Sequence, residues 1–253
     1  MHFLKLLKIE RIKCKRSKII PFIFIAPILV VSSGVANLST YFTPEYTQAW
    51  PAMFIQSALL YAYYLLPFSM IVVCVMITGQ ENSHNGLLKM LALPVNRHTL
   101  SLAKFCILVF YLLMEILVFL AVFVIAGYIA VVTSGITETL PLPYLLKWCA
   151  GLFLTMLPSL SVMWMLTVLF EKPLLSVGLN LMLVIPGLLA GATPAWFLYP
   201  YCYSGYLVSR SLQAFTTEVT ADTALQLFPF IPCAVLIFTL ALFISASRFG
   251  KQT

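Results

Sequence analysis

Six long apolar segments divide this chain, and they decide what it can fold into. They lie at roughly Ile19–Leu38, Ala52–Ile77, Ser101–Val131, Leu145–Phe170, Pro173–Gly191 and Leu227–Ser247. A helix of about 20 apolar residues crosses a bilayer, and 62% of the 253 residues are hydrophobic against 9% charged. No soluble core of this length could bury so much apolar surface, so the pattern predicts an all-α polytopic membrane protein with six transmembrane helices. Nothing marks a second domain, and residues 1–253 are predicted to form a single transmembrane domain.

Lysine and arginine lie almost entirely on one side of these six spans. The basic residues on that side lie before the first span, in the connection between the second and third spans, at Lys172, and after the sixth span. Only Lys147 and Arg210 fall on the opposite side. Basic residues favour the cytosolic ends of spans, so both termini are expected in the cytosol. Topology thereby accounts for the net charge of +7, and no nucleic-acid partner is expected.

Two segments outside the spans are predicted to lie at the membrane surface. Residues 1–18 combine lysines and arginines with the apolar residues Phe3, Leu4, Leu6, Leu7, Ile9 and Ile12. This is typical of an amphipathic helix in the cytosolic interface with its basic face on anionic headgroups, although a plain topogenic charge cluster is an alternative. Residues 192–226 are too polar to cross, and their aromatic residues (Trp196, Phe197, Tyr199, Tyr201, Tyr203 and Tyr206) are typical of headgroup level. We expect an outer interfacial hairpin of one or two short helices there, the second starting near Thr220.

The polar connection from Gln80 to Lys104 contains an amphipathic segment of its own. Asn82 or Ser83 can cap a short helix, and Pro94 ends it because the residue before a proline is pushed out of helical geometry. Within it, Lys89 lies on the face opposite an apolar stripe formed by Leu87, Leu88, Met90 and Leu91. Thr99 can cap the third span. The pattern predicts a short cytosolic helix, Gly86–Leu93, that passes a push from a cytosolic partner to the second and third spans.

The same connection, QEN…GLLKMLALPVNR…LAKF, also carries a family resemblance. Its matching residues are Glu81, Leu88, Leu91, Leu93-Pro94-Val95, Arg97 and Lys104. They resemble the first cytosolic loop of type-two ABC exporter permeases, in particular the branch that serves lantibiotic immunity and bacitracin resistance. In that family the loop is the coupling helix, which sits in a groove of the nucleotide-binding subunit. The resemblance implies an ATPase-coupling set of Glu81, Gly86, Leu87, Leu88, Lys89, Leu91, Pro94 and Arg97.

The resemblance implies a permease subunit of an ATP-driven exporter in a bacterial plasma membrane, with a lantibiotic-like antimicrobial peptide or another amphipathic molecule as its substrate. The chain has no GxxxxGK[ST] phosphate-binding loop. We therefore expect no enzymatic activity in this chain, and ATP and Mg in a separate cytosolic ATPase present in two copies. The other expected partners are membrane lipid and a second permease, either homologous or a copy of this chain.

Glu115 is the one acidic residue deep inside a predicted span. An ionisable group there costs several kcal/mol unless it is paired or hydrated, so it is a functional candidate. A structural hydrogen bond, a place in the substrate path and a proton-coupling role all remain open. The last would make the chain a proton-coupled secondary transporter, and a non-transporting membrane anchor or sensor subunit is a further alternative. The tyrosines Tyr61, Tyr63 and Tyr64 either stack on a substrate or fill contacts within the protein.

Other chemistry is not indicated. The histidines His2, His84 and His98 all lie outside the spans, so a Ser-His dyad cannot form inside the membrane. No cluster has metal-ligand spacing, and we predict no catalytic, cofactor-binding or metal-binding residue. Small residues within the spans are expected to serve helix packing: Ser159, Ser161, Ser176, Gly178, Gly187 and Gly191.

Overall fold

The computed structural model describes residues 3–15, 19–36, 49–82, 96–134, 140–170, 172–216 and 227–249. All regular structure in these ranges is helical, as predicted. The helices are α1 (Phe3–Lys15), α2 (Ile19–Ala36), α4 (Ala49–Leu60), the π-helical turn η1 (Tyr61–Leu65), α5 (Leu66–Asn82), α7 (Arg97–Ser134), α8 (Leu142–Leu169), α9 (Pro173–Val184), α10 (Gly187–Gly191), the 3-10 turns η3 (Trp196–Leu198) and η4 (Pro200–Cys202), α11 (Tyr203–Thr216) and α12 (Leu227–Arg248).

Five stretches of the described helices are long and apolar enough to cross a membrane. These are Gln56–Gly79, Arg97–Val132, Leu142–Leu169, Pro173–Gly191 and Phe228–Arg248. A sixth candidate is the pair formed by α1 and α2, which meet at a bend of 71°. Of this pair, α2 is the apolar member, and α1 carries Lys5, Lys8, Arg11 and Lys13. The structure therefore places a separate basic helix before the first span, where the sequence predicts one.

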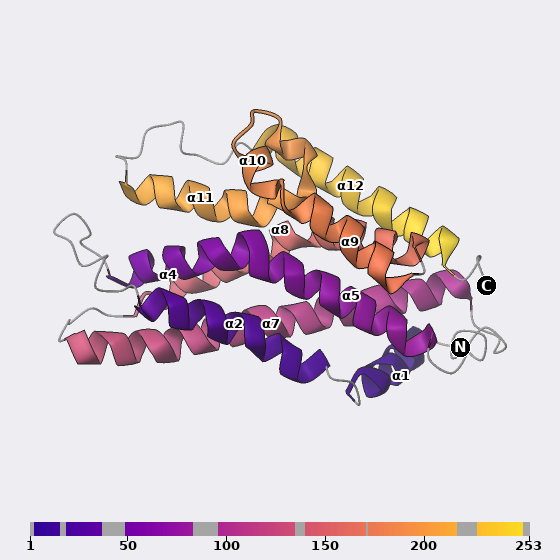
Figure 1. Cartoon of the computed structure of the whole chain (residues 1–253), viewed down its shortest axis with the longest axis horizontal. Helices are drawn as coiled ribbons and strands as arrows, with labels where there is room; N and C mark the ends of the chain where they lie inside the picture. The colour runs from indigo at the N-terminus through magenta and orange to yellow at the C-terminus, as the bar shows by residue number, and fades with distance from the viewer. Residues whose placement is uncertain are drawn as a thin grey trace.

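The long helices lie side by side, with α2 packed along α7 and α12 packed along α8 (Figure 1). The beginning of α1, the end of α5, the beginning of α7 and the end of α12 lie at one end of the molecule. The ends of α7 and α11 lie at the other end (Figure 1). The two helices that flank the connection at residues 83–95 therefore leave and re-enter the bundle at the end that also holds α1 and the end of α12.

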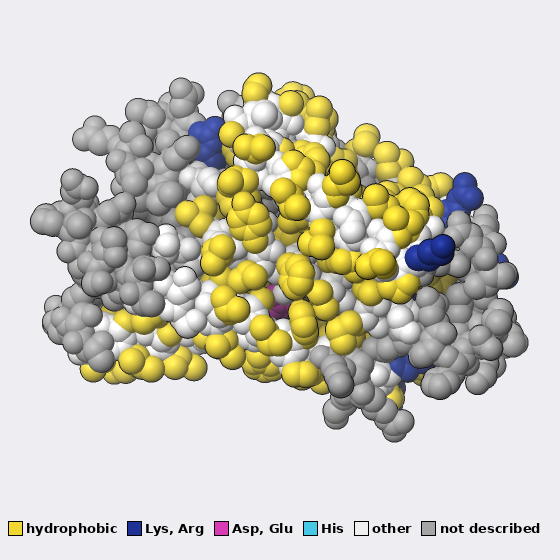
Figure 2. All heavy atoms as spheres, viewed as in Figure 1, with side chains coloured by type: hydrophobic (Ala, Val, Ile, Leu, Met, Phe, Trp, Pro, Cys, Tyr) yellow, Lys and Arg dark blue, Asp and Glu magenta, His cyan; other side chains and the backbone are white. Residues whose placement is uncertain are grey.

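An apolar surface covers the middle of the molecule. Figure 2 shows hydrophobic side chains over most of the visible helical face, with Lys and Arg side chains near its two ends. Large exposed apolar residues occur on α2, α7, α9 and α12, for example Ile28, Ile129, Leu174 and Phe243. An exposed apolar surface of this extent is unfavourable in water and suits contact with lipid. This distribution is that of a polytopic membrane protein.

The structure adds detail to three predicted segments. The helix that contains the second span continues to Asn82, beyond the end expected for the span at Ile77. The fifth span has its predicted bounds, Pro173–Gly191, and is broken inside, between α9 and α10, because Pro186 has no N–H to continue the helical hydrogen bonds. In the outer segment, α11 begins at Tyr203 and is one short helix of the expected kind; the second start, expected near Thr220, lies outside the described residues.

Candidate functional site

The structure describes the two helices that flank the predicted ATPase-coupling set and leaves most of the set itself undescribed. Gly86, Leu87, Leu88, Lys89, Leu91 and Pro94 lie outside the described residues. Glu81 belongs to the last turn of α5, and Arg97 is the first, exposed residue of α7. The coupling helix itself stays a prediction, but the helices on either side of it are now placed.

The cap of α7 is Asn96 and not Thr99, which corrects the sequence prediction. The Asn96 side-chain oxygen accepts a hydrogen bond from the His98 N–H at 3.0 Å. A side-chain oxygen that binds the second N–H of a helix is the usual N-cap arrangement. Thr99 lies inside the first turn of α7.

Lys104 is locked to α1 by a buried ion pair. Its Nζ donates to Glu10 Oε2 at 2.8 Å, and the side chains of Lys104 and Glu10 are 1% and 2% exposed. Lys13 donates to the other carboxylate oxygen of Glu10, also at 2.8 Å. Burial alone would raise the pKa of Glu10, but attraction and hydrogen bonds from the two lysines outweigh it, so the pKa lies below its ordinary value.

The sequence prediction missed this pair. It used Lys104 only for the family resemblance and assigned no role to Glu10, because the two residues lie 94 positions apart. One signal was available: Leu6, Glu10 and Cys14 recur at the four-residue spacing of a single helix face. All three are buried. An acidic residue on such a face needs a basic partner, and Lys104 is a basic residue near the start of the third apolar span.

Glu115 lies deep in the bundle with no exposed surface. The Tyr61 hydroxyl donates to Glu115 Oε1 at 3.3 Å, and the Tyr61 ring stacks on Phe119 with centroids 4.6 Å apart. The Ser69 hydroxyl lies close enough to interact with the carboxyl, although neither Ser69 Oγ nor Glu115 Oε2 has a hydrogen bond. A buried polar atom without a partner is unfavourable, so the Glu115 carboxyl is a position that calls for an explanation. This site joins α7 to η1 and α5.

Tyr61 lies in a π-helical turn that interrupts the second span. In this turn the Leu66 N–H bonds to the carbonyl of Tyr61, five residues earlier. Such turns occur frequently at functional sites. The sequence prediction also missed the turn, although Pro67 was a signal for it, because a proline within a helix removes a backbone donor.

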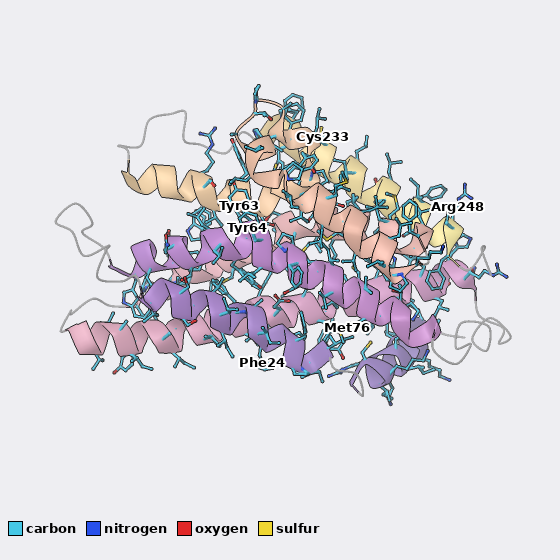
Figure 3. All side chains as sticks on the ribbon, in the orientation of Figure 1. Phe24, Tyr63, Tyr64, Met76, Cys233 and Arg248 are labelled. Carbon is cyan, nitrogen blue, oxygen red and sulfur yellow. The ribbon has the colours of Figure 1, made fainter. Side chains whose placement is uncertain are left out.

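The tyrosines of the π-helical turn contact different helices: Tyr61 contacts α7, and Tyr63 contacts α11. Tyr63 Oη lies 2.9 Å from Ser209 Oγ on α11, and a Cβ added to Gly205 would meet the Tyr63 ring at 2.3 Å. Figure 3 shows Tyr63 and Tyr64 where this turn faces α11. Tyr64 is 41% exposed. The contacts of Tyr61 and Tyr63 favour packing within the protein over stacking on a substrate, and Tyr64 keeps both possibilities.

Several aromatic residues of the outer segment pack against one another inside the protein, a contact that the sequence prediction did not include. Trp196 stacks on Tyr206 with centroids 3.9 Å apart, and the Arg210 Nε donates to Tyr206 Oη at 2.8 Å. Tyr201 and Tyr203 are buried as well. Composition alone could not predict this packing, because aromatic residues suit both the membrane interface and a protein core.

Most of the small residues serve packing, as expected. Ser159 and Ser161 bond to carbonyls of their own helix, and Ser176 joins α9 to Thr167 of α8 at 3.0 Å. A Cβ on Gly187 or Gly191 would lie 3.3 Å from the nearest atom of another segment. Gly178 differs, since nothing lies within 4 Å of an added Cβ there.

A family comparison identifies what kind of protein this bundle is. The family described as ABC-2 family transporter protein matches residues 6–187 of the chain. The chain belongs to the ABC-2 transporter family. It is therefore a multi-pass membrane permease of an ABC transporter, the transmembrane component of an assembly with ABC ATPase subunits, and it is not itself catalytic. No curated protein and no solved structure matches it. Among the described residues no His, Cys, Asp and Glu group could hold a metal ion.

Proposed function

We propose that this ABC-2 permease exports an amphipathic antimicrobial peptide, lantibiotic-like in character, from a bacterial plasma membrane. The substrate class rests on the resemblance of residues 80–104 to the lantibiotic-immunity and bacitracin-resistance branch. ATP is bound and hydrolysed, with Mg, by two copies of a separate cytosolic ATPase. A second permease, either homologous or a copy of this chain, completes the path. Both termini lie in the cytosol.

The observation that carries the coupling mechanism is the Tyr61–Glu115 contact. Two helical paths lead from the 83–95 connection to this one contact. One runs from Asn82 back to Tyr61, and the other runs from Arg97 forward to Glu115. At 1.5 Å per residue these paths are about 32 Å and about 27 Å long. Two stiff helices thus connect the predicted docking helix to a buried polar contact within the membrane region.

We expect the following mechanism. When ATP closes the two ATPase subunits, their motion carries the Gly86–Leu93 helix and displaces the attached ends of α5 and α7. Rigid helices pass that displacement to the buried contact and change how the permease halves pack. The peptide, taken from the outer leaflet, then leaves at the outer end, where the segment from Trp196 to Tyr206 lies.

Aspartate substitutions on the predicted apolar stripe test the coupling. In Leu88→Asp or Leu91→Asp, the ATPase should still co-purify from membranes in which the permease is expressed normally, but stimulation of ATP hydrolysis and export of a lantibiotic should be lost. Leu140→Asp is the matched control, because Leu140 is an exposed leucine in the connection before α8, at the opposite end of the bundle. Normal coupling in the Leu88 and Leu91 variants would remove the basis of the proposal.

The unpartnered Glu115 Oε2 favours a second candidate, a proton-coupled transporter. Glu115→Gln separates the two, because an amide oxygen can still accept from Tyr61 but the side chain cannot carry a proton across its working cycle. ATP-driven export should survive this substitution under the first candidate. Export driven by a pH gradient in vesicles without an ATPase, and its loss in Glu115→Gln, would support the second. A non-transporting anchor or sensor subunit would export nothing under either condition.

A further inference from the structure

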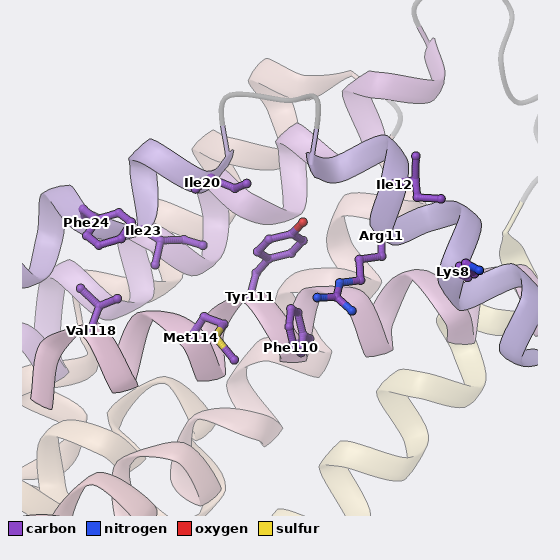
Figure 4. A pocket seen from close by; sticks show the side chains of 10 residues that line it. All are labelled: Lys8, Arg11, Ile12, Ile20, Ile23, Phe24, Phe110, Tyr111, Met114 and Val118. Atoms are coloured by element: carbon purple, nitrogen blue, oxygen red, sulfur yellow. The ribbon is translucent and has the colours of Figure 1, made fainter. Parts of the chain in front are cut away.

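An open groove of about 530 Å³ lies where α1, α2 and α7 meet. Its apolar part is formed by Ile20, Ile23 and Phe24 of α2 with Met114 and Val118 of α7. Its other end is formed by Lys8, Arg11 and Ile12 of α1 with Phe110 and Tyr111 of α7 (Figure 4). The groove is therefore apolar along the first span and basic where the span meets α1.

The basic end of the groove carries two positive side chains, Lys8 and Arg11, that no described carboxylate pairs with. Lys8 and Arg11 are both exposed. Among the described side chains neither forms an ion pair, since the carboxylate of Glu10 on the same helix binds Lys104 and Lys13. The Arg11 guanidinium lies over the Phe110 ring, 5.4 Å from its centroid, and Figure 4 shows it beside Tyr111. This contact with the ring holds the guanidinium at the groove and leaves its charge uncompensated.

We infer that the groove binds one anionic phospholipid. The phosphate would lie against Lys8 and Arg11, and an acyl chain would lie along Ile20, Phe24 and Val118. The volume is within the range of small-molecule pockets, about 300–1,000 Å³. The order of the lining, basic beside α1 and apolar along the span, is the order of headgroup and hydrocarbon in a single leaflet. Arginine and lysine are the usual partners of a phosphate.

A second copy of the chain fits this groove less well. In a two-fold contact the same patch meets itself, so Lys8 and Arg11 would approach their own counterparts without an acidic residue between them. An anionic lipid instead brings the opposite charge. It would also bridge α1 to the first span across the groove, on a side of α1 that the Glu10–Lys104 pair does not hold.

Native mass spectrometry of the full-length permease tests this inference. The protein is equilibrated in detergent with equal amounts of phosphatidylglycerol and phosphatidylcholine, and the lipids retained per chain are counted. We expect one retained phosphatidylglycerol, preferred over phosphatidylcholine on the order of tenfold because each basic side chain adds to the attraction. Lys8→Gln combined with Arg11→Gln should abolish the preference. Both side chains are exposed, so the fold should persist, and an unchanged unfolding temperature without added lipid verifies it.

Lys5→Gln is the matched control, because Lys5 is an exposed lysine of α1 outside the groove. It should leave the preference intact. Val118→Phe should reduce retention of both lipids by filling the apolar part of the groove. Equal retention of the two lipids by the unaltered protein would overturn the inference. An equal loss of the preference in Lys5→Gln would also overturn it, because that result indicates diffuse charge attraction. A third contrary result would be a disulfide between two copies of an Ile20→Cys variant that prevents lipid retention, because the groove would then be an interface between copies.

Discussion

Replacement of Lys104 by methionine should weaken the docking of α1 on α7. Removing one partner of a buried ion pair costs about 3–5 kcal/mol, because the remaining charge is left without compensation. Here Lys13 still binds the other oxygen of Glu10, and its side chain is 35% exposed. The cost should therefore fall at the low end, about 3 kcal/mol. Since each 1.4 kcal/mol is a factor of ten, the undocked form of α1 should become roughly 100-fold more populated.

Cys14 reports this docking directly. It lies on the same face of α1 as Glu10 and is 1% exposed, so a thiol reagent reaches it only when α1 leaves α7. In a variant whose other cysteines are replaced, maleimide labelling of Cys14 should accelerate by roughly the same 100-fold in Lys104→Met, because labelling follows the population of the open form. The measurement is the labelling rate at a fixed pH in purified, full-length protein.

Two further variants decide whether the buried pair is the cause. Lys13→Met removes the same charge from the exposed partner, which is worth about 1 kcal/mol or less, and should accelerate labelling by less than about fivefold. Glu10→Met with Lys104→Met replaces both charges by apolar side chains, a change that is often nearly neutral, and should restore slow labelling. If Lys104→Met labels Cys14 at the original rate, or Lys13→Met accelerates labelling as much, the reasoning is refuted.

Three other outcomes are expected. The pKa of Glu10 is lowered in the docked state, so docking of α1 should be fully stabilised above the ordinary carboxyl pKa of about 4.3 and should weaken as the pH falls from there toward the lowered value; deuterium exchange in α1, corrected for its intrinsic pH dependence, measures this. Gly205→Ala should destabilise the protein by about 1–3 kcal/mol because its Cβ meets a tyrosine ring, whereas Gly178→Ala, with open space around it, should be neutral or slightly stabilising in the same thermal unfolding assay. Asn96→Ala should lower stability by about 1 kcal/mol and Thr99→Ala by much less, since only the first removes the cap of α7; an equal loss in both would contradict the assignment.

The membrane spans could be predicted from the sequence because the thickness of a bilayer fixes the length of an apolar helix. The third span, expected at Ser101–Val131, lies within α7, and the fourth, expected at Leu145–Phe170, nearly coincides with α8. Membership of the ABC-2 permeases could be predicted as well, because its signal lies in a short connection with its own pattern, and the match over residues 6–187 confirms that level of the prediction. The lantibiotic-immunity branch stays a proposal.

Contacts between distant helices could not be predicted in the same way. The partner of Lys104 lies on α1, and the partner of Glu115 lies in the π-helical turn of the second span. A hydrophobicity pattern shows that a face is buried but does not show which helix covers it. The outer aromatic residues illustrate the same limit, since composition does not show that Trp196 stacks on Tyr206.

The arrangement of polar residues on α7 suggests which part of the permease moves. Lys104 and Glu115 are eleven residues apart, about three helical turns, and so lie on almost the same face. Leu108, Leu112 and Phe119 occupy that face between and beyond them, each with no exposed surface. One buried stripe thus binds α1 at its beginning and η1 further along. A rotation of α7 alone would break both the Lys104–Glu10 pair and the Tyr61–Glu115 hydrogen bond, and would leave their polar groups buried without partners. A push at the 83–95 connection should therefore move α1, α7 and η1 together as one rigid group, and the change in packing should occur at the borders of that group.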